Sequence, residues 1–235
     1  MRAKIFILLF FIAQFSFAGD FTDFRSIDRA SLKPFAADIG GVMGGGMNYT
    51  ARSLGFSGFD ISFRDVYQFK PSHANKPMHS DRAFGFNFVQ AEIGMPYRID
   101  GFIRAGGGAG VGVIGGGIKY GLWKVLDELH RIHGVLVLNS NMANYKDFYA
   151  VQFGVQAVFS MNCGNFRPFA SLGLDDTRLT VKNANDSSLV DKTVTTLEER
   201  YSAGFRWRVK WVNISAAYNL LHDQSGVEGA LGIRF

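Results

Sequence analysis

The sequence lacks the features that define several large classes of protein. After residue 18 no run approaches the ~18 consecutive apolar residues of a membrane-spanning helix, which excludes helical spans from that part of the chain. Cys163 is the single cysteine, so no disulfide can form within the chain. The formal net charge of +5 is too diffuse to indicate binding to nucleic acid. It fits better with contact to anionic lipopolysaccharide and with an arginine-lined interior.

Recognisable ligand-binding motifs are also missing. The glycine runs at 106–110 and 115–117 lack the Gly-Lys-Ser/Thr sequence of a phosphate loop, and no strand–helix context surrounds them. His130 and His133 are three residues apart, but two histidines alone favour a solvated face over a metal site. We therefore predict neither a cofactor nor a metal ion.

The chain is instead rich in glycine, in phenylalanine and in alternating segments. Its 28 Gly and 23 Phe suit a β-barrel, where small residues allow close strand packing and aromatic residues form girdles. In residues 56–67, apolar and polar residues alternate, which is typical of a strand with one apolar face. Such segments predict about ten strands, with a short periplasmic helix at 121–132. The predicted strands are 56–67, 83–95, 101–109, 111–121, 133–142, 147–160, 166–180, 194–209, 211–222 and 226–235.

The first 54 residues do not follow this alternation. Residues 1–18 combine Arg2 and Lys4 with a short apolar core and small residues before Gly19, which predicts a cleaved signal peptide. We expect residues 19–54 to form a periplasmic lead-in or a helical or irregular plug in the barrel mouth. The glycine run at 40–46 opposes a stable helix there, and a first strand at 35–48 is the competing interpretation. The barrel domain is predicted at 55–235.

The closing segment, 226–235, alternates apolar with polar or small residues and ends on Phe235. Together with residues 58–62 and 166–174 it resembles small bacterial outer-membrane β-barrel proteins, many of them uncharacterised. The resemblance covers about 55–235. It implies an all-β, transmembrane, antiparallel up-and-down barrel in the outer membrane, surrounded by lipid and lipopolysaccharide. It also implies that the barrel-assembly machinery recognises Phe235. The oligomeric state stays open, and no site residues carry over.

Loop lengths suggest an orientation for such a barrel. Outer-membrane barrels have short periplasmic turns and longer external loops. If the chain enters and leaves the barrel in the periplasm, the long loops 69–82 and 181–193 fall outside. The tight turns at 162–165 and near Lys210 then lie in the periplasm.

Charged residues of the predicted strands share the face opposite the aromatic residues. A charge on the lipid face near mid-membrane costs about 2–4 kcal/mol, so a membrane barrel must turn its charges inward. A soluble β-sandwich would reverse the two faces. The residues expected to face the lumen are Asp60, Arg64, Glu92, Arg104, Glu198, Arg200, Arg206, Arg208, Glu228 and Arg234.

These inward charges allow two functional interpretations. They form an ion-pair network that stiffens a narrow lumen, or they line a polar conduit or anion pocket built on Arg200, Arg206, Arg208 and Arg234. Ten strands are too few for a wide pore. We therefore predict a structural role or the passage of small solutes, without catalysis. The alternatives are binding or adhesion through the two long loops, and hydrolysis at the external rim by Asp175, Asp176, His222 and Asp223.

Overall fold

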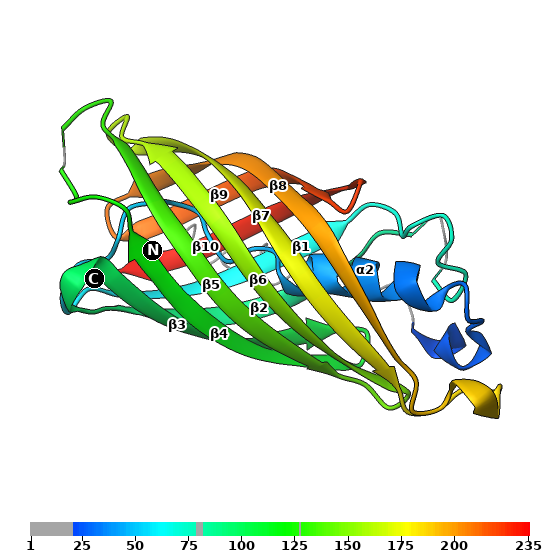
Figure 1. The fold of residues 1–235 in the computed structure, drawn as a ribbon. Helices are drawn as coiled ribbons and strands as arrows, with labels where there is room; N and C mark the ends of the chain where they lie inside the picture. The colour runs from blue at the N-terminus through cyan, green and yellow to red at the C-terminus, as the bar shows by residue number, and fades with distance from the viewer. Residues whose placement is uncertain (1–20, 79–81, 127) are drawn as a thin grey trace, which may run out of the picture.

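The computed structural model describes residues 21–78, 82–126 and 128–235, so the predicted signal peptide lies outside the described residues. Within them, ten antiparallel strands close into one barrel, in which each strand pairs with its neighbours in sequence and β1 pairs with β10 (Figure 1). This confirms the predicted fold class. The strands are β1 Phe59–Gln68, β2 Phe84–Gly94, β3 Ile99–Gly108, β4 Val111–Gly121, β5 Ile132–Asn144, β6 Phe148–Met161, β7 Phe166–Val181, β8 Thr193–Val209, β9 Val212–Leu221 and β10 Gln224–Arg234.

The two faces of the sheet have the polarity of a membrane barrel. On β1 the outward side chains of Phe59, Ile61 and Phe63 are about 40% exposed, whereas the inward Asp60 and Arg64 are 1% exposed. A soluble sandwich would bury the aromatic face and expose the charges. The exposures therefore decide between the two interpretations in favour of a barrel whose outer surface contacts lipid.

The first and last strands close the barrel. Asp60 is opposite Arg234, and the main chains of Phe59 and Phe235 exchange two hydrogen bonds of 3.3 and 2.9 Å. The rings of Phe59 and Phe235 stack outside with centroids 6.5 Å apart. The C-terminal segment is thus the closing strand, as the resemblance to small outer-membrane barrels implies.

The barrel has two distinct ends. The β1–β2 and β7–β8 connections lie at one end, which we call the loop end, and the tight turns at 162–165 and 210–211 lie at the other with Phe235. We call the latter the C-terminal end. Because outer-membrane barrels carry their longer loops outside, we expect the loop end on the outer side.

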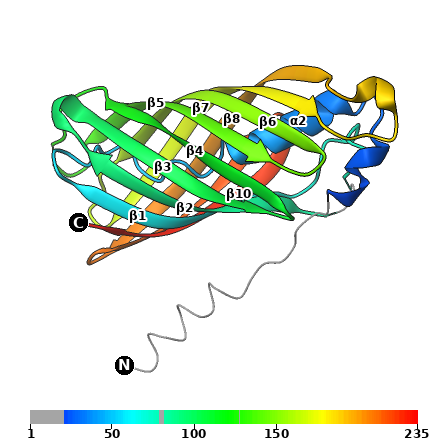
Figure 2. The same cartoon turned by 90° about the horizontal axis from the view of Figure 1, so that it is seen from below.

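The segment that precedes β1 runs through the inside of the barrel. The 3₁₀ helix η1, Thr22–Ser26, lies at the loop end, and α2, Leu32–Met43, lies inside the wall against β8, β7 and β6 (Figure 2). The competing strand at 35–48 is wrong, because α2 occupies most of it. Residues 21–31 lie at the end of the barrel opposite Phe235.

Glycine has a low helix propensity, yet the glycines of α2 are the residues that allow this helix to pack closely against the barrel wall. A Cβ at Gly40 would lie 2.0 Å from Thr177 Oγ1, so only glycine allows this approach. Tertiary packing therefore outweighs the weak local propensity. Among the described residues, α2 and the other helices are all too short or too polar to span a bilayer.

The predicted short helix at 121–132 is not found among the described residues of that connection. Its backbone is instead tied to the neighbouring turn: His130 N donates to Asn162 O at 2.7 Å and Asn162 N donates to Arg131 O at 2.8 Å. The Trp123 indole also donates to Ile132 O at 2.8 Å. These bonds, two of them to the β6–β7 turn, take the place of the hydrogen bonds within a helix.

Candidate functional site in the barrel lumen

The lumen collects most of the charged residues that the sequence assigns to it. Arg64, Arg200 and Arg206 are each 1% exposed, and their side chains point into the interior of a closed wall. Arg208 is a correction: it is exposed at the C-terminal rim, where its Nε donates to Lys210 O at 2.9 Å, because β8 ends one residue later. Glu198 is half-buried near the loop end. The remaining predicted residues, Asp60, Glu92, Arg104, Glu228 and Arg234, are buried or half-buried inside.

Cations of the wall hold the N-terminal segment by its backbone. Each of these side chains donates a hydrogen bond to a carbonyl oxygen of the segment that passes through the lumen. The acceptors follow one another along that segment from Gly41 to Ser53. The pairs are Arg200 Nη2 to Gly41 O (2.6 Å), Arg104 Nη1 to Gly45 O (2.8 Å), Arg64 Nη1 to Gly46 O (2.9 Å), Lys119 Nζ to Met47 O (3.1 Å) and Arg234 Nη2 to Ser53 O (2.8 Å). Bonds from charged donors are roughly twice as strong as neutral ones.

Buried acids complete the network. Glu92 accepts from Arg64 at 2.6 Å and from Lys119 at 2.8 Å, and Asp175 accepts two bonds from Arg200 at 2.8 and 2.5 Å. These acids and cations therefore compensate one another's charge through direct ion pairs. Other members take neutral partners: the Tyr49 hydroxyl donates to Asp60, Arg206 donates to Asn213, and Asn219 donates to Glu228. Lys119 also belongs to this lumen network, but the sequence did not indicate it. The glycines around it on β4 obscure the alternation of apolar and polar residues in that strand.

The glycine run at 44–46 is the sequence signal for this arrangement. A Cβ at Gly44 would lie 2.5 Å from Arg200 Nη2 and 2.7 Å from Asp175 Oδ1. Gly46 has a φ of 66°, a conformation that L side chains rarely adopt. Side chains at these positions would push the cations away from the carbonyls, so the run marks a close approach between the segment and the wall.

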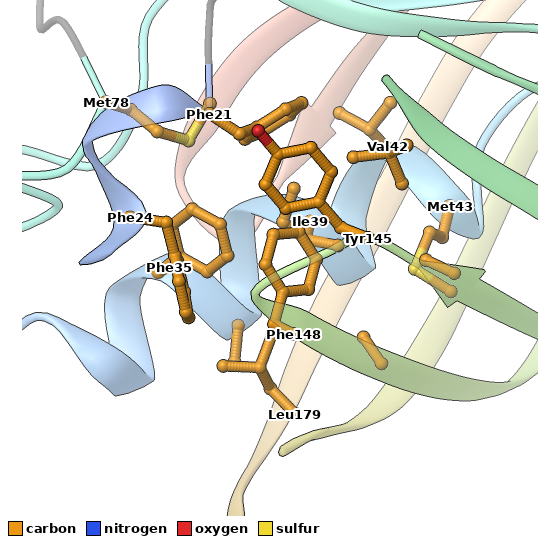
Figure 3. Close-up of a cluster of buried hydrophobic side chains, with 14 of the residues drawn as sticks. Phe21, Phe24, Phe35, Ile39, Val42, Met43, Met78, Tyr145, Phe148 and Leu179 are labelled. Atoms are coloured by element: carbon orange, nitrogen blue, oxygen red, sulfur yellow. The ribbon is translucent and has the colours of Figure 1, made fainter. Parts of the chain in front are cut away.

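An apolar cluster closes the loop end of the lumen (Figure 3). Phe24 lies 4.8 Å from both Phe35 and Phe148 between ring centroids, and Phe21 packs at 6.0 Å from Tyr145. The rings come from η1, from α2 and from the wall, so the cluster joins the N-terminal segment to the barrel. We call residues 21–43 the cap.

The space that the segment leaves is small. The cavity in the C-terminal half, lined by Tyr49, Asp60, Arg64, Glu92 and Arg234 among others, measures about 10 Å³. One water molecule needs roughly 10–15 Å³. This cavity therefore has room for about one water molecule.

The loop-end rim contains a second polar cluster, which differs from the predicted one. Asp38 of α2 is fully buried and accepts from Gln68 (2.7 Å), Ser72 (2.8 Å) and Asn75 (2.5 Å), and His222 Nε2 lies 3.0 Å from its Oδ1. His222 is thus at the rim as predicted, but its carboxylate partner comes from the N-terminal segment. Sequence spacing gives no signal for that pairing.

The other predicted rim residues do not join this cluster. Asp175 is buried in the lumen beside Arg200, Asp176 faces outward 4.0 Å from Arg178, and Asp223 is exposed in the β9–β10 turn. Ser72 Oγ is 3.5 Å from His222 Nδ1 and donates to Asp38 instead. Among the described residues no group of three or more His, Cys, Asp or Glu has the geometry to hold a metal ion.

A closed antiparallel sheet with an apolar outer surface and a charged interior defines an integral outer-membrane β-barrel protein. No protein-family model and no curated protein matches the sequence.

Solved structures of similar fold are small barrels. The N-terminal barrel domain of Pseudomonas aeruginosa OprF is 14% identical, with a TM-score of 0.39, over 77% of this chain and 99% of that one. Neisserial surface protein A is 14% identical, with a TM-score of 0.37, over 75% and 95%. The outer membrane enzyme PagL is 11% identical, with a TM-score of 0.30, over 75% and 98%.

Proposed function

We propose that this protein is a sealed outer-membrane barrel with a structural role, whose lumen is permanently filled by its own N-terminal segment. The observation that carries the proposal is the double attachment of that segment. Wall cations bind its backbone from Gly41 to Ser53, and the cap buries its aromatic side chains at the loop end.

The extent of the cap's burial favours a sealed lumen over a gated passage. The cap contributes eight large apolar side chains that are 3% exposed or less: Phe21, Phe24, Ile27, Leu32, Phe35, Ile39, Val42 and Met43. Release of the cap would expose all of this apolar surface to water and would also break the hydrogen bonds from the wall arginines to the backbone of the segment. The cap is therefore expected to stay in place.

The adhesion alternative has less support, because the long loops bind the cap. Ser72 and Asn75 of the β1–β2 loop donate to Asp38, and Lys76 forms an ion pair with Asp28 at 2.5 Å. In the β7–β8 loop, Asn185 N donates to Arg25 O at 2.7 Å. These contacts hold the loops against the mouth of the barrel.

The hydrolase alternative has less support because, among the described residues, the predicted Asp175, Asp176 and Asp223 do not join His222 in the rim cluster. A serine nucleophile needs its hydroxyl hydrogen directed at a general base. Ser72 directs that hydrogen at Asp38, which also accepts from Gln68 and Asn75 and lies 3.0 Å from His222 Nε2. In the rim cluster, the buried Asp38 carboxylate instead attaches α2 to β1 and to the β1–β2 loop.

Lumen access tests the proposal. In a Cys163→Ser background, Ser202→Cys places a thiol in the lumen and Asn144→Cys places one at the exposed loop end of β5. A charged maleimide is expected to label the Asn144→Cys protein within minutes and to leave the Ser202→Cys protein unlabelled until it is unfolded.

Planar-bilayer recording of the wild type provides the functional readout. A sealed barrel gives the baseline of a protein-free bilayer. Discrete conductance steps, or rapid labelling of Ser202→Cys in folded protein, would show that the lumen is open and would refute the proposal.

A further inference from the structure

At the loop end, the sheet extends further on the β7 side of β8 than on its β9 side. β8 pairs with β7 along Thr193–Thr180 and onward, but its pairing with β9 begins only at Arg200, opposite Leu221. The chain then turns at 222–223 into β10. In the described part of the chain, residues 193–199 therefore have a strand neighbour on one side alone, and the β7–β8 hairpin extends beyond the β9–β10 hairpin (Figure 1).

Alternate residues of this free edge direct their backbone N–H and C=O groups to the side of β8 that has no paired strand. His222 N donates to Glu199 O at 3.1 Å, so the carbonyl of Glu199 points toward the β9 side. Backbone direction in a strand alternates with a period of two residues, so Leu197 and Thr195 direct their N–H and C=O groups to the same side. Among the described residues no hydrogen-bond partner is found for them there.

A groove runs along this edge. Two cavities of about 430 and 380 Å³ open onto it, and both are lined by Leu197, Glu198 and His222. The larger continues to Lys33 and Ala37 of α2 and the smaller to Tyr201, so the opposite wall of the groove is formed by the helix and the β9–β10 turn.

A buried polar atom also lacks a partner in this groove. Thr196 lines the larger cavity, is 8% exposed, and its Oγ1 has no hydrogen-bond partner among the described residues. An unpaired buried hydroxyl costs about 1–3 kcal/mol relative to a paired one. The groove thus presents unpaired backbone groups and an unpaired side chain to the same space.

The edge lies beyond the hydrocarbon of the membrane. The outward side chains of this stretch include Thr195 and Glu199, and those of the adjacent β7 include Asp176 and Arg178. Open sheet edges and outward charges do not occur in contact with lipid tails. The groove is therefore accessible from the outer side.

Its charge is acidic. Glu198, Glu199 and Asp223 line the smaller cavity, Lys33 is the cation of the larger one, and His222 is bound to Asp38. Leu197, 68% exposed, adds an apolar contact between the carboxylates.

We propose that the free edge of β8 at 193–199 binds an extended, basic polypeptide segment of an extracellular partner, which pairs with Thr195 and Leu197 as an added strand. Main-chain bonds to the edge supply the affinity, and basic side chains next to Glu198 and Glu199 select the partner. This site is separate from the sealed lumen and does not depend on it.

The test uses the full-length protein in detergent micelles and a fluorescein-labelled heptapeptide in which lysine alternates with threonine. Fluorescence anisotropy is expected to show saturable binding, about ten-fold tighter than that of the same peptide with glutamate in place of lysine. N-methylation of alternate peptide nitrogens removes the donors on one edge and is expected to abolish binding.

Variants at one position separate strand addition from simple charge attraction. Leu197→Pro removes an edge-facing N–H that does not bond to β7, and is expected to weaken binding about five-fold more than Leu197→Ala, which keeps it. Glu198→Gln combined with Glu199→Gln is expected to weaken binding about ten-fold. Glu128→Gln, an exposed carboxylate at the C-terminal end, is the control without effect.

Equal binding by the Leu197→Pro and Leu197→Ala proteins, or undiminished binding of the N-methylated peptide, would overturn the proposal. So would a peptide-free dimer that Leu197→Pro dissociates, because the occupant of the edge would then be a second copy of the chain. Heat-modifiable gel migration checks that each variant folds. If Leu197→Pro does not fold, the N-methylated peptide with the wild type still decides the question.

Discussion

The Arg200 guanidinium donates to the carbonyl of Gly41 at 2.6 Å and at the same time binds the Asp175 carboxylate through two bonds of 2.8 and 2.5 Å. One side chain of the wall thereby fixes both the charge balance of the lumen and the position of the helix that fills it. The relationship joins residues 159 positions apart in sequence.

Arg200→Ala is expected to destabilise the barrel strongly. Removal of one partner leaves the Asp175 carboxylate buried without a counter-charge, which costs about 3–5 kcal/mol. Arg200→Lys keeps the charge but loses the two guanidinium donors that bind Asp175 Oδ2 together, so an intermediate loss is expected. Urea unfolding in lipid vesicles, followed by tryptophan fluorescence, measures both. A loss below about 1 kcal/mol for Arg200→Ala would contradict the role given to this side chain.

Gly44→Ala is expected to cost about 1–3 kcal/mol, because the new methyl group overlaps Arg200 Nη2 and Asp175 Oδ1. The matched control is Gly112→Ala on β4, where a Cβ meets nothing within 4 Å. The control is expected to change the free energy of unfolding by less than about 0.5 kcal/mol. Equal effects of the two substitutions would mean that the close approach at Gly44 is unimportant.

Phe35→Ala tests the cap. Phe35 is fully buried against Phe24 and Phe148, so its truncation leaves a cavity that costs about 3–5 kcal/mol. The expected result is faster proteolysis of residues 21–43 while the barrel itself stays resistant. Phe56→Ala, at a ring that is 75% exposed, is the control and should leave proteolysis unchanged.

The contact between the β1–β2 loop and the cap is expected to weaken in acid. Hydrogen bonds from the Lys76 ammonium and from Ser31 lower the pKa of Asp28 to about 2. Because the folded-state pKa lies below the unfolded value of about 3.9, the contribution of this pair is complete above pH 4 and is lost as the pH falls through 2.

Lys76→Ala removes the first of these donors and should raise the Asp28 pKa, which titration by carboxyl NMR measures directly. Lys124→Ala, at the opposite end of the barrel, should leave it unchanged. An Asp28 pKa that does not respond to Lys76→Ala would show that the ion pair does not form in solution.

Much of the barrel could be predicted from sequence because its signals are local. The side chains of Phe59, Asp60 and Ile61 alternate between lipid and lumen through strand geometry alone, and the membrane makes that alternation strict by penalising outward charges. Strand number and the identity of most lumen charges follow from the same rule. Arg208 departs from it because the strand ends there and the side chain reaches water.

The sealing segment could not be predicted in the same way. The propensities of Gly40, Gly41 and Gly44 oppose a helix, and nothing local indicates that the wall supplies a close-fitting surface for α2. The Asp38–His222 pair likewise joins two residues whose sequence neighbourhoods carry no shared pattern.

The sequence by itself determined that this chain forms strands with one apolar and one charged face, and that the last of them closes a barrel at Phe235. Only the tertiary structure decided what the charged face does. The arginines bind a backbone that passes through the lumen, because closure of the sheet brings Gly41 and Arg200 into a buried interior. There an unpaired charge is costly, and each carbonyl oxygen is a partner that stabilises it.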